Sequence, residues 1–197
     1  ASVARTIRRP RFNHLSPAVL EEEIGDSDFV GNPDLRPEIA LGFDLGYERR
    51  LGRRGVAGIN VFYRDITDLI EEVVVTDAVG APLEGSGGAG TFIYSVDNVG
   101  DGQVWGIELD LSTPLDVLGL PDTGIFLNWS WLDSRVEDFM GERRFNGQSD
   151  QVLSAGFTHD IPAWQAAFGA TYFHQGEAYD RVLAEEVHTR YGDNLEI

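Results

Sequence analysis

The sequence offers few residues that could hold a metal ion or carry out catalysis. Its histidines are His14, His159, His174 and His188, and none stands at the spacing that paired metal ligands on a helix require. The chain contains no cysteine, which excludes disulfides, iron–sulfur clusters, thiolate zinc sites and a cysteine nucleophile. Neither an HExxH nor a GxSxG sequence occurs. We therefore predict no catalytic residue, no metal site and no cofactor, and we do not expect an enzyme.

Two other segments come close to known ligand-binding loops without meeting their requirements. The acidic stretch 21–28 precedes a glycine as a calcium-binding EF-hand loop would, but Val30 and Pro37 occupy the fifth and twelfth positions. We interpret this stretch as a solvated acidic loop. The glycine-rich segment Gly85–Gly90 is not followed by Lys-Ser/Thr, so it is not a phosphate-binding loop. It is expected to be a flexible connection.

Charge and composition narrow the class of protein further. The 197 residues include 33 Asp and Glu against 15 basic residues, all of them Arg, for a formal net charge of -18. Nucleic acid is excluded as a partner because binding to phosphates requires a basic surface. Hydrophobic residues make up 42%, enough for a folded chain. No run of 18 consecutive apolar residues occurs, so no transmembrane helix is expected.

The elements that would position any functional residue are strands. Apolar residues recur at every second position, for example from Leu41 to Tyr47, and this period is typical of a strand with one apolar face. The clearest segments are Ala40–Glu48, Val104–Thr113, Ile125–Ser134 and Gln165–Gln175, with weaker ones at Val56–Asp65 and Gln151–Asp160. With Ser2–Arg8 and Val187–Ile197 the count is about eight strands. We predict an all-β, antiparallel fold.

The connections between these strands alternate in length. Short turns are expected at Arg49–Gly55, Leu115–Gly124 and Ile161–Trp164, and long polar loops at Pro10–Pro37, Thr76–Gly90, Glu137–Asp150 and Asp180–Glu186. Two of the strands could run about 20 residues, well beyond the usual ~5–6. Short turns at one end of a sheet and long loops at the other are typical of an outer-membrane barrel, with the turns in the periplasm and the loops outside the cell.

Side-chain placement agrees with a barrel. Aromatic residues lie near both ends of the strands, as in the girdles at the two membrane interfaces; they are Tyr47, Trp164 and Phe168 near the short turns, and Tyr63, Trp105 and Trp131 toward the long loops. Ordinary core packing is the alternative, since strands favour aromatics. The acidic residues Asp44, Glu48, Glu108 and Asp110 would face the lumen of a barrel or, alternatively, the solvated face of a soluble sheet.

Three segments resemble one family. GNPDLRPEIALGFDLGY at Gly31–Tyr47 is similar to the Asn-Pro-x-Leu-Lys/Arg-Pro-Glu segment that precedes a strand in TonB-dependent outer-membrane receptors. The hairpin GFDLGYERRLGRRGVAGINVFYRDITDLI resembles the same family, and so does YSVDNVGDGQVWGIELDLS, with its asparagine-containing loop and aromatic-Gly-Ile-Glu strand. The order and spacing of the three segments match as well.

This resemblance implies an outer-membrane location in a Gram-negative bacterium and TonB-energised uptake of a scarce solute: siderophore-iron, cobalamin, a saccharide or a peptide. Residues 1–197 would form part of a 22-stranded barrel, from its second half, without the plug domain, the TonB box and the C-terminal strands. Implied partners are the plug in cis, the TonB complex, and outer-membrane lipid with lipopolysaccharide.

Two groups of residues are candidates for specific roles. Loop residues that could grip an anion or stack on a ligand are Arg8, Arg9, Arg11, Arg143, Arg144 and Phe145; pairing with nearby acids or with lipopolysaccharide is the alternative for each Arg. The segment Asn32, Pro33, Asp34, Leu35, Arg36, Pro37 and Glu38 is assigned a structural role. Its prolines restrict the residues before them to extended backbone, and Asp34 could form an Asx turn.

Two other functions remain open on sequence alone. One is a small eight-stranded outer-membrane barrel with a structural or adhesive role, which is disfavoured because its packed interior would bury unpaired carboxylates. The other is a soluble β-sandwich that binds a ligand such as a carbohydrate. A sandwich would have to cover the apolar rows of this sheet with a second sheet.

Overall fold

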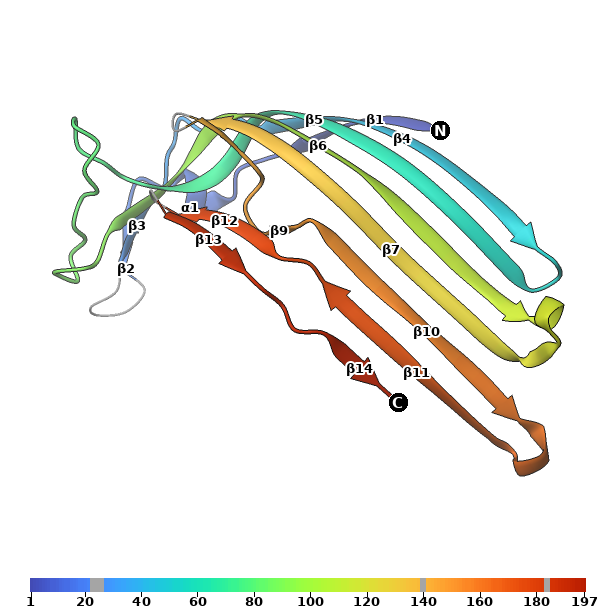
Figure 1. Ribbon diagram of the computed structural model, residues 1–197. Coiled ribbons are helices and arrows are strands. Elements are labelled where there is room, and N and C mark those ends of the chain that lie inside the picture. Colours follow the sequence, from blue (N-terminus) through green and yellow to red (C-terminus); the bar gives the residue numbers. More distant parts are fainter. Residues whose placement is uncertain (22–26, 139–140, 183–184) are drawn as a thin grey trace.

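The computed structural model describes residues 1–21, 27–138, 141–182 and 185–197. One long sheet dominates it, with a main path of antiparallel strands in the order β1-β4-β5-β6-β7-β10-β11-β14 (Figure 1). Their bounds are Ser2–Arg8, Glu38–Leu51, Gly55–Val74, Ile93–Leu115, Leu120–Asp138, Gln151–Ile161, Ala166–Gln175 and Asn194–Glu196. The predicted antiparallel architecture of about eight strands is confirmed.

Smaller elements occupy the long connections. They are α1 (Phe12–Leu15), β2 (Val19–Glu21), β3 (Asp28–Val30), β8 (Gly141–Arg143), β9 (Gln148–Ser149), β12 (Ala178–Val182) and β13 (Glu185–Thr189). The short 3-10 turns η1 (Asp116–Leu118) and η2 (Pro162–Trp164) join β6 to β7 and β10 to β11. Strands β9, β12 and β13 form a separate three-stranded sheet.

The prediction of one strand over Val187–Ile197 was wrong. Glu185–Thr189 pairs with β12 in the small sheet, whereas only Asn194–Glu196 returns to pair with β11. Because the two pieces have different backbone partners, the chain must leave one sheet before it joins the other, and a single strand cannot do both.

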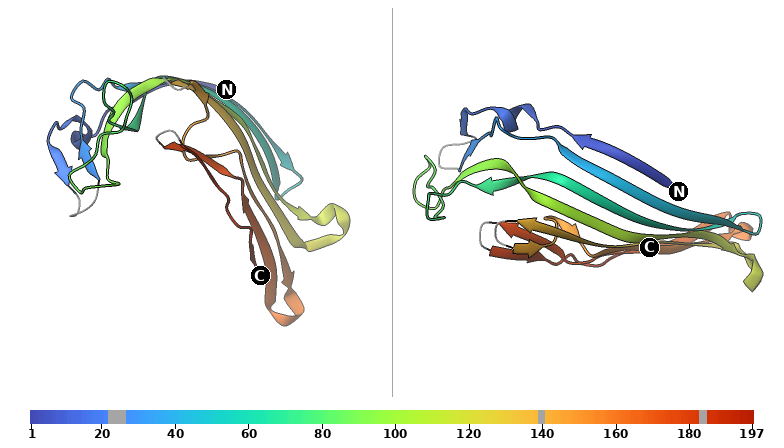
Figure 2. Two further views of the ribbon diagram at one scale, coloured as in Figure 1. Left: turned by 60° about the vertical axis from the view of Figure 1, so that its left-hand side comes forward. Right: turned by 90° about the horizontal axis from the view of Figure 1, so that it is seen from above.

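The sorting of connections by length is confirmed. The turns of the hairpins β4–β5, β6–β7 and β10–β11 lie together at one end of the strands, whereas α1, β2, β3, β12 and β13 lie at the other end (Figure 1). Figure 2 shows that the sheet is curved and that the long connections stay at this end in both views. The end that carries these connections is called the loop end below, and the opposite end is the turn end.

Strand register separates the two faces of the sheet. Tyr47, Ile59, Leu109, Trp129 and Leu153 lie in one cross-strand row, because each is paired with the next. Residues in directly paired positions share a face. Apolar residues on this face are exposed; Leu45 is 64% accessible and Tyr47 65%. No second sheet covers this face among the described residues, which removes the packing that a soluble sandwich requires.

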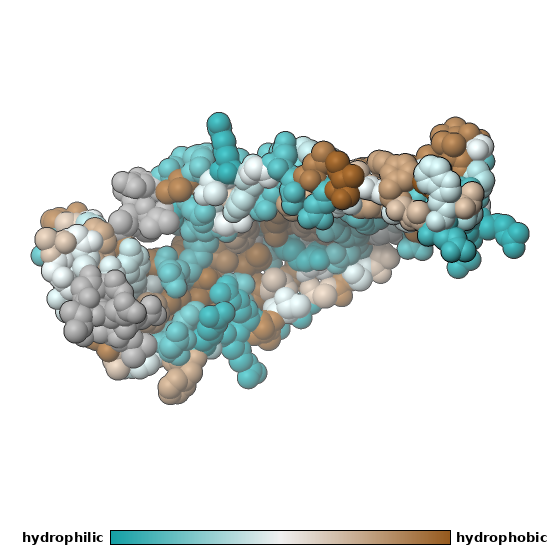
Figure 3. Space-filling model, turned by 90° about the horizontal axis from the view of Figure 1, so that it is seen from below, coloured by the Kyte–Doolittle hydropathy of each residue, from teal (hydrophilic) through white to brown (hydrophobic). Residues whose placement is uncertain are grey.

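The opposite face, called the polar face below, carries mainly polar and small residues, with the rings of Phe62 and Phe126 lying over Gly106 and Gly156. Gly46, Asn60, Glu108 and Ser130 form one cross-strand row on it. Figure 3, the view from below, shows hydrophilic side chains interspersed with hydrophobic ones over the molecule. A buried apolar cluster of Leu35, Ile70 and Val96, flanked by Leu15 and Phe29, lies under the loop end.

Candidate functional site

The segment Asn32–Glu38 begins as a tight turn at the loop end. The side-chain oxygen of Asn32 accepts a hydrogen bond from the backbone N–H of Asp34 at 3.0 Å, which makes an Asx turn. The turn predicted for Asp34 is therefore made by Asn32, because an Asx turn is closed by the N–H two residues after the side chain that accepts it. Gly31 packs so closely that a Cβ there would meet three backbone carbonyl oxygens within 2.7 Å.

Asn98 fixes the same segment to the sheet from a distance of 62 residues in sequence. Its side-chain oxygen accepts from Arg36 N–H at 2.9 Å, and its amide donates to Arg36 O at 3.1 Å and to Asp68 O at 2.8 Å. The Arg36 guanidinium also pairs with Asp68 at 2.6 Å. Two of the three segments singled out in the sequence thus bind each other directly. This contact holds the Asn32–Glu38 segment against the sheet, and the structural role of the segment stays a prediction.

The first arginine candidate, Arg8, is held by the strand that follows this segment. Its guanidinium donates to Glu38 at 3.0 Å and to the carbonyl oxygen of Ile70 at 3.3 Å. Arg9 and Arg11 are exposed and have no ion-pair partner among the described residues. Phe12, next to them at the start of α1, is 91% accessible. This corner of the loop end therefore combines two unpaired cations with an exposed aromatic ring.

Arg143 is placed very differently. Its side chain is only 3% exposed and pairs with Glu71 at 2.5 Å and with Asp138 at 2.6 Å. Burial by itself would lower the pKa of this guanidinium, but the hydrogen bonds from it to the two carboxylates raise the pKa above its ordinary value. Arg143 therefore stays charged, and it joins β5 to the β7–β8 hairpin.

The neighbouring candidates also pack against the sheet. Arg144 pairs with Asp133 at 3.3 Å. The backbone N–H of Phe145 donates to the Ser134 hydroxyl at 2.9 Å, and its ring lies so close to Gly102 that a Cβ there would meet it at 2.8 Å. Residue 102 must be small for the ring to lie on the polar face. The structure thus places Arg143, Arg144 and Phe145 at the loop end, where each contacts a different strand of the sheet: β5, β7 and β6, respectively.

Residues that sequence reasoning missed complete this region. The amide of Asn146 donates to Arg181 O at 3.3 Å, and its oxygen accepts from Arg181 N–H at 2.8 Å, which joins the loop before β9 to β12. Arg181 also pairs with Glu186 at 2.9 Å. No local sequence pattern predicts such pairs. Only the polar character of both loops indicated that the residues could form hydrogen bonds.

A further contact joins the start of β3 to the glycine-rich loop after β5. Asp28 is 5% exposed, and its carboxylate accepts hydrogen bonds from the backbone N–H and the hydroxyl of Ser86 at 2.6 and 2.7 Å. The glycine-rich loop expected to be flexible is thus anchored at Ser86. The rest of the acidic stretch, 22–26, lies outside the described residues.

The polar face of the sheet carries the predicted lumen acids. Asp44 pairs with Arg64 at 2.7 Å, and Glu108 accepts from the Asn60 amide at 3.0 Å. Glu48 and Asp110 lie in one row, because both are paired with Gly58. A wall lined with such groups is expected to face water or another polar domain, because apolar lipid would leave these charges unsolvated.

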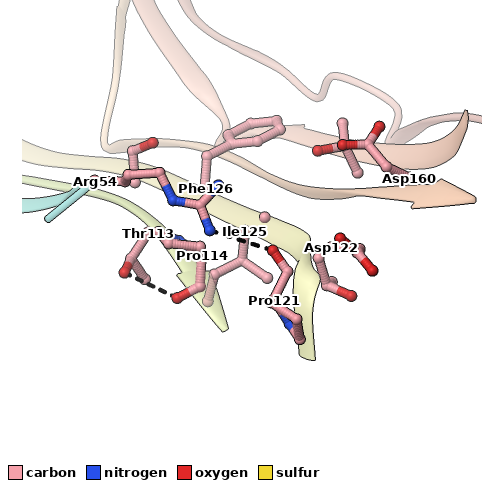
Figure 4. A pocket seen from close by; sticks show the side chains of 12 residues that line it. Arg54, Thr113, Pro114, Pro121, Asp122, Ile125, Phe126 and Asp160 are labelled. Carbon is pink, nitrogen blue, oxygen red and sulfur yellow. Dashed lines mark hydrogen bonds between the residues drawn. The ribbon is translucent and has the colours of Figure 1, made fainter. Parts of the chain in front are cut away.

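A shallow cavity of about 290 Å³ lies at the turn end of the same face. Figure 4 shows Arg54 among its lining residues, beside Pro121, whose carbonyl oxygen accepts from the guanidinium at 3.3 Å. Thr113, Phe126 and Asp160 also line it. No group of His, Asp and Glu within the described ranges could hold a metal ion. The cavity holds no constellation that suggests catalysis.

Aromatic residues on the apolar face of the sheet lie next to a polar boundary near the loop end. Tyr63 and Trp105 are paired, and the next outward positions toward the loop end are Asp65 and Gln103, which are also paired. Trp131 lies on the same face, paired with Ile107. Aromatic residues therefore lie just below a polar boundary, as expected for an interfacial girdle. Of the described helices, none has the length and hydrophobicity to cross a membrane.

Together, an exposed apolar face, a polar opposite face, long strands and sorted connections define the wall of an outer-membrane β-barrel. Comparison with known families identifies which one: the sequence model described as "TonB dependent receptor-like, beta-barrel" matches residues 1–194. The chain belongs to this family, whose members are transport receptors of the Gram-negative outer membrane. This membership decides against the small closed barrel and the soluble sandwich.

Individual relatives agree with the family. An iron-regulated outer membrane virulence protein of Vibrio cholerae is 27% identical over 113 residues, which are 57% of this chain and 17% of that protein. Among solved structures, the siderophore receptor PirA of Acinetobacter baumannii matches with a TM-score of 0.66 at 15% identity. That match covers 98% of this chain and 31% of PirA.

A ferric enterobactin receptor mutant of Pseudomonas aeruginosa (PfeA, in complex with enterobactin) matches with a TM-score of 0.62 at 20% identity. That match covers 98% of this chain and 29% of PfeA. At these identities the structural matches show the shared fold. The chain spans less than a third of the length of each of these three proteins.

Proposed function

We propose that this chain forms part of the barrel wall and extracellular loops of a receptor that imports an iron–siderophore complex. The observation that carries the proposal is the loop end itself. There, a clamp built by Asn98 and a buried ion-pair cluster around Arg143 hold long loops above a polar wall. Such rigid support is what a binding surface made of loops needs, because loops that stay mobile lose more entropy when a ligand binds.

The choice of siderophore-iron over cobalamin, saccharide or peptide rests on relatives. Two solved neighbours are siderophore receptors by description, one of them in complex with enterobactin, and the Vibrio relative is iron-regulated. Ferric siderophores are commonly anionic, and an exposed guanidinium is well suited to an anion. Five of the six candidate residues are Arg, and they differ in whether the guanidinium is exposed and free of an acidic partner.

Arg9 and Arg11 are the strongest of these candidates. Both are exposed and lack an ion-pair partner among the described residues, whereas the guanidinium of Arg143 already serves two carboxylates. Arg8 and Arg144 each have one acidic partner, and the Phe145 ring lies over Gly102. We therefore assign ligand contact to Arg9 and Arg11, and support of the loops to Arg143, Arg144 and Phe145.

Transport would follow the scheme of the family. Ligand binding at the loops shifts a plug domain that fills the barrel in cis, and force from TonB at the inner membrane opens a path. The acids of the polar face, with Asp44 paired to Arg64, would border the plug. Lipid and lipopolysaccharide would surround the apolar face.

Uptake of radioactive iron in a strain that produces the complete receptor tests the proposal. Ferric siderophores of different chemical classes are offered one at a time, with and without functional TonB. We expect uptake of at least one that is abolished without TonB, while its binding to cells persists. Uptake that continues without TonB, or failure to take up any ferric siderophore while another solute enters, would contradict the proposal.

Variants of the exposed arginines test the ligand contact separately. Arg9→Ala with Arg11→Ala should raise the Kd for the ferric siderophore about tenfold or more, because a charged hydrogen bond contributes roughly 1.5–3 kcal/mol. Arg135→Ala is the matched control, since this exposed Arg at the same end of the strands already pairs with Glu142 at 2.6 Å. Equal effects of the two replacements would remove the assignment of Arg9 and Arg11.

A further inference from the structure

One turn of the barrel carries a concentration of positive charge that transport does not explain. Four of the chain's 15 basic residues lie within six positions at the β4–β5 turn, namely Arg49, Arg50, Arg53 and Arg54. The connections β6–β7 and β10–β11 at the same end, with the strand ends beside them, contain no Arg and carry acids instead, including Asp116, Asp122 and Asp160. In a chain with a net charge of -18, this turn is a local exception.

The partners of these arginines separate them into two kinds. Arg54 donates to Asp116 on the neighbouring turn at 2.9 Å, so its charge is balanced within the protein. Arg49, Arg50 and Arg53 are exposed and have no ion-pair partner among the described residues. Three cations at this turn are therefore available to an external anion.

Strand register assigns Arg49 to the apolar face. It is paired with Ala57, which is paired with Leu111, and Tyr47 precedes it by two positions on the same side of β4. Arg50 lies on the opposite, polar face, paired with Val56 and through it with Ser112. Adjacent residues of one turn thus place equal charges on the lipid side and the lumen side.

The depth of Arg49 matches the lipid headgroups. From Ile39 to Tyr47 the outward residues of β4 are apolar, and this stretch rises about 27 Å along the strand at ~3.4 Å per residue. At a tilt of ~40° that is about 20 Å across the bilayer, close to the ~25 Å apolar band of such barrels. Arg49 lies ~5 Å further on, within a headgroup layer roughly 5–7 Å thick.

We propose that Arg49 and Arg53 form a binding site for the phosphate groups of anionic phospholipids in the periplasmic leaflet of the outer membrane. Short turns of this family lie on the periplasmic side. The Tyr47 ring, 65% exposed, lies at the edge of the hydrocarbon region, and the two guanidinium groups lie beyond it. A planar guanidinium binds phosphate oxygens in pairs, and its apolar stem can remain in the acyl region.

The position of Arg49 favours a lipid over an acidic periplasmic protein. A protein docking on the periplasmic rim would reach residues at the tip of the turn. It would not reach an outward residue next to the ring of Tyr47, because lipid occupies that space. The Arg54–Asp116 pair also restrains the turn that carries Arg53.

Spin-labelled lipids test the proposal on the complete receptor in vesicles of zwitterionic phospholipid. Electron paramagnetic resonance measures how strongly spin-labelled phosphatidylglycerol associates with the barrel relative to spin-labelled phosphatidylcholine. A basic residue near the surface contributes about fivefold in association with anionic lipid, the equivalent of about 1 kcal/mol. We expect Arg49→Gln to reduce the preference for phosphatidylglycerol several-fold, and Arg49→Gln with Arg53→Gln to abolish it.

Arg50→Gln is the matched control, because it removes the same charge from the same turn on the other face. A preserved preference in this variant supports a site on the lipid side. An equal loss in Arg49→Gln and Arg50→Gln would mean diffuse attraction by net charge and would overturn the site. The proposal also fails if the unmodified receptor shows no preference for phosphatidylglycerol. Cross-linking from position 53 in intact cells would then test an acidic protein as the partner.

Discussion

Replacing Asn98 by alanine should release the Asn32–Glu38 segment from the sheet while the barrel stays intact. The side chain makes three hydrogen bonds, two to the backbone of Arg36 and one to the carbonyl oxygen of Asp68. At about 1 kcal/mol each, their loss would cost about 3 kcal/mol. Water can partly replace the two at Arg36, which are exposed, so the expected cost of local opening falls to about 2 kcal/mol.

Hydrogen exchange followed by mass spectrometry can measure this local opening in the complete receptor. A cost of about 2 kcal/mol predicts roughly 30-fold faster exchange in peptides that cover residues 32–38, with little change in the middle of β5 and β6. Asn98→Asp keeps the acceptor for Arg36 N–H but places a carboxylate oxygen against the carbonyl oxygens of Arg36 and Asp68, so its effect should be at least as large as that of alanine.

Asn128→Ala is the control for this experiment. Asn128 lies in the middle of β7 on the polar face, and its side chain makes no hydrogen bond to any other described residue. Exchange at residues 32–38 should be unchanged in that variant. If Asn98→Ala leaves exchange in this segment unchanged, or accelerates it equally throughout the barrel, then Asn98 is not the clamp.

Three further predictions concern the loop end. Arg143→Met leaves the partly buried carboxylates of Glu71 and Asp138 without their shared cation, so we expect destabilisation of the region by about 3–5 kcal/mol and faster proteolysis within 137–150. Unchanged proteolysis would refute this. Hydrogen bonds from Arg190 and then His188 lower the pKa of Glu177 below its ordinary value of 4.5. The contribution of this carboxylate to holding β13 is therefore fully present above pH 4.5 and lost as the pH falls through the lower folded-state pKa. A nitroxide on a cysteine introduced at Val187 should become more mobile over that acidic range, and less so in Glu177→Gln. Gly31→Ala should loosen the turn before β4, because its methyl group would overlap three carbonyl oxygens, and binding of ferric siderophore should weaken without loss of barrel heat stability.

The sequence by itself determined the faces and ends of the sheet. Alternation of apolar and polar residues is a local property of extended backbone, so the lipid-facing row through Tyr47 and the polar row through Glu108 could be predicted without knowing any partner strand. The prolines of the Asn32–Glu38 segment likewise indicated a rigid turn from local restrictions on the backbone. Connection length then indicated which end carries the loops.

Only the tertiary structure decided which polar residues meet. Asn98 clamps Arg36 from 62 positions away, and Arg143 finds Glu71 across 72 positions, because strand register and loop folding bring them together. A guanidinium in a polar loop has the same appearance in the sequence whether it ends buried between carboxylates, as Arg143 does, or exposed, as Arg9 does. The difference depends on long-range contacts, and no local pattern encodes them.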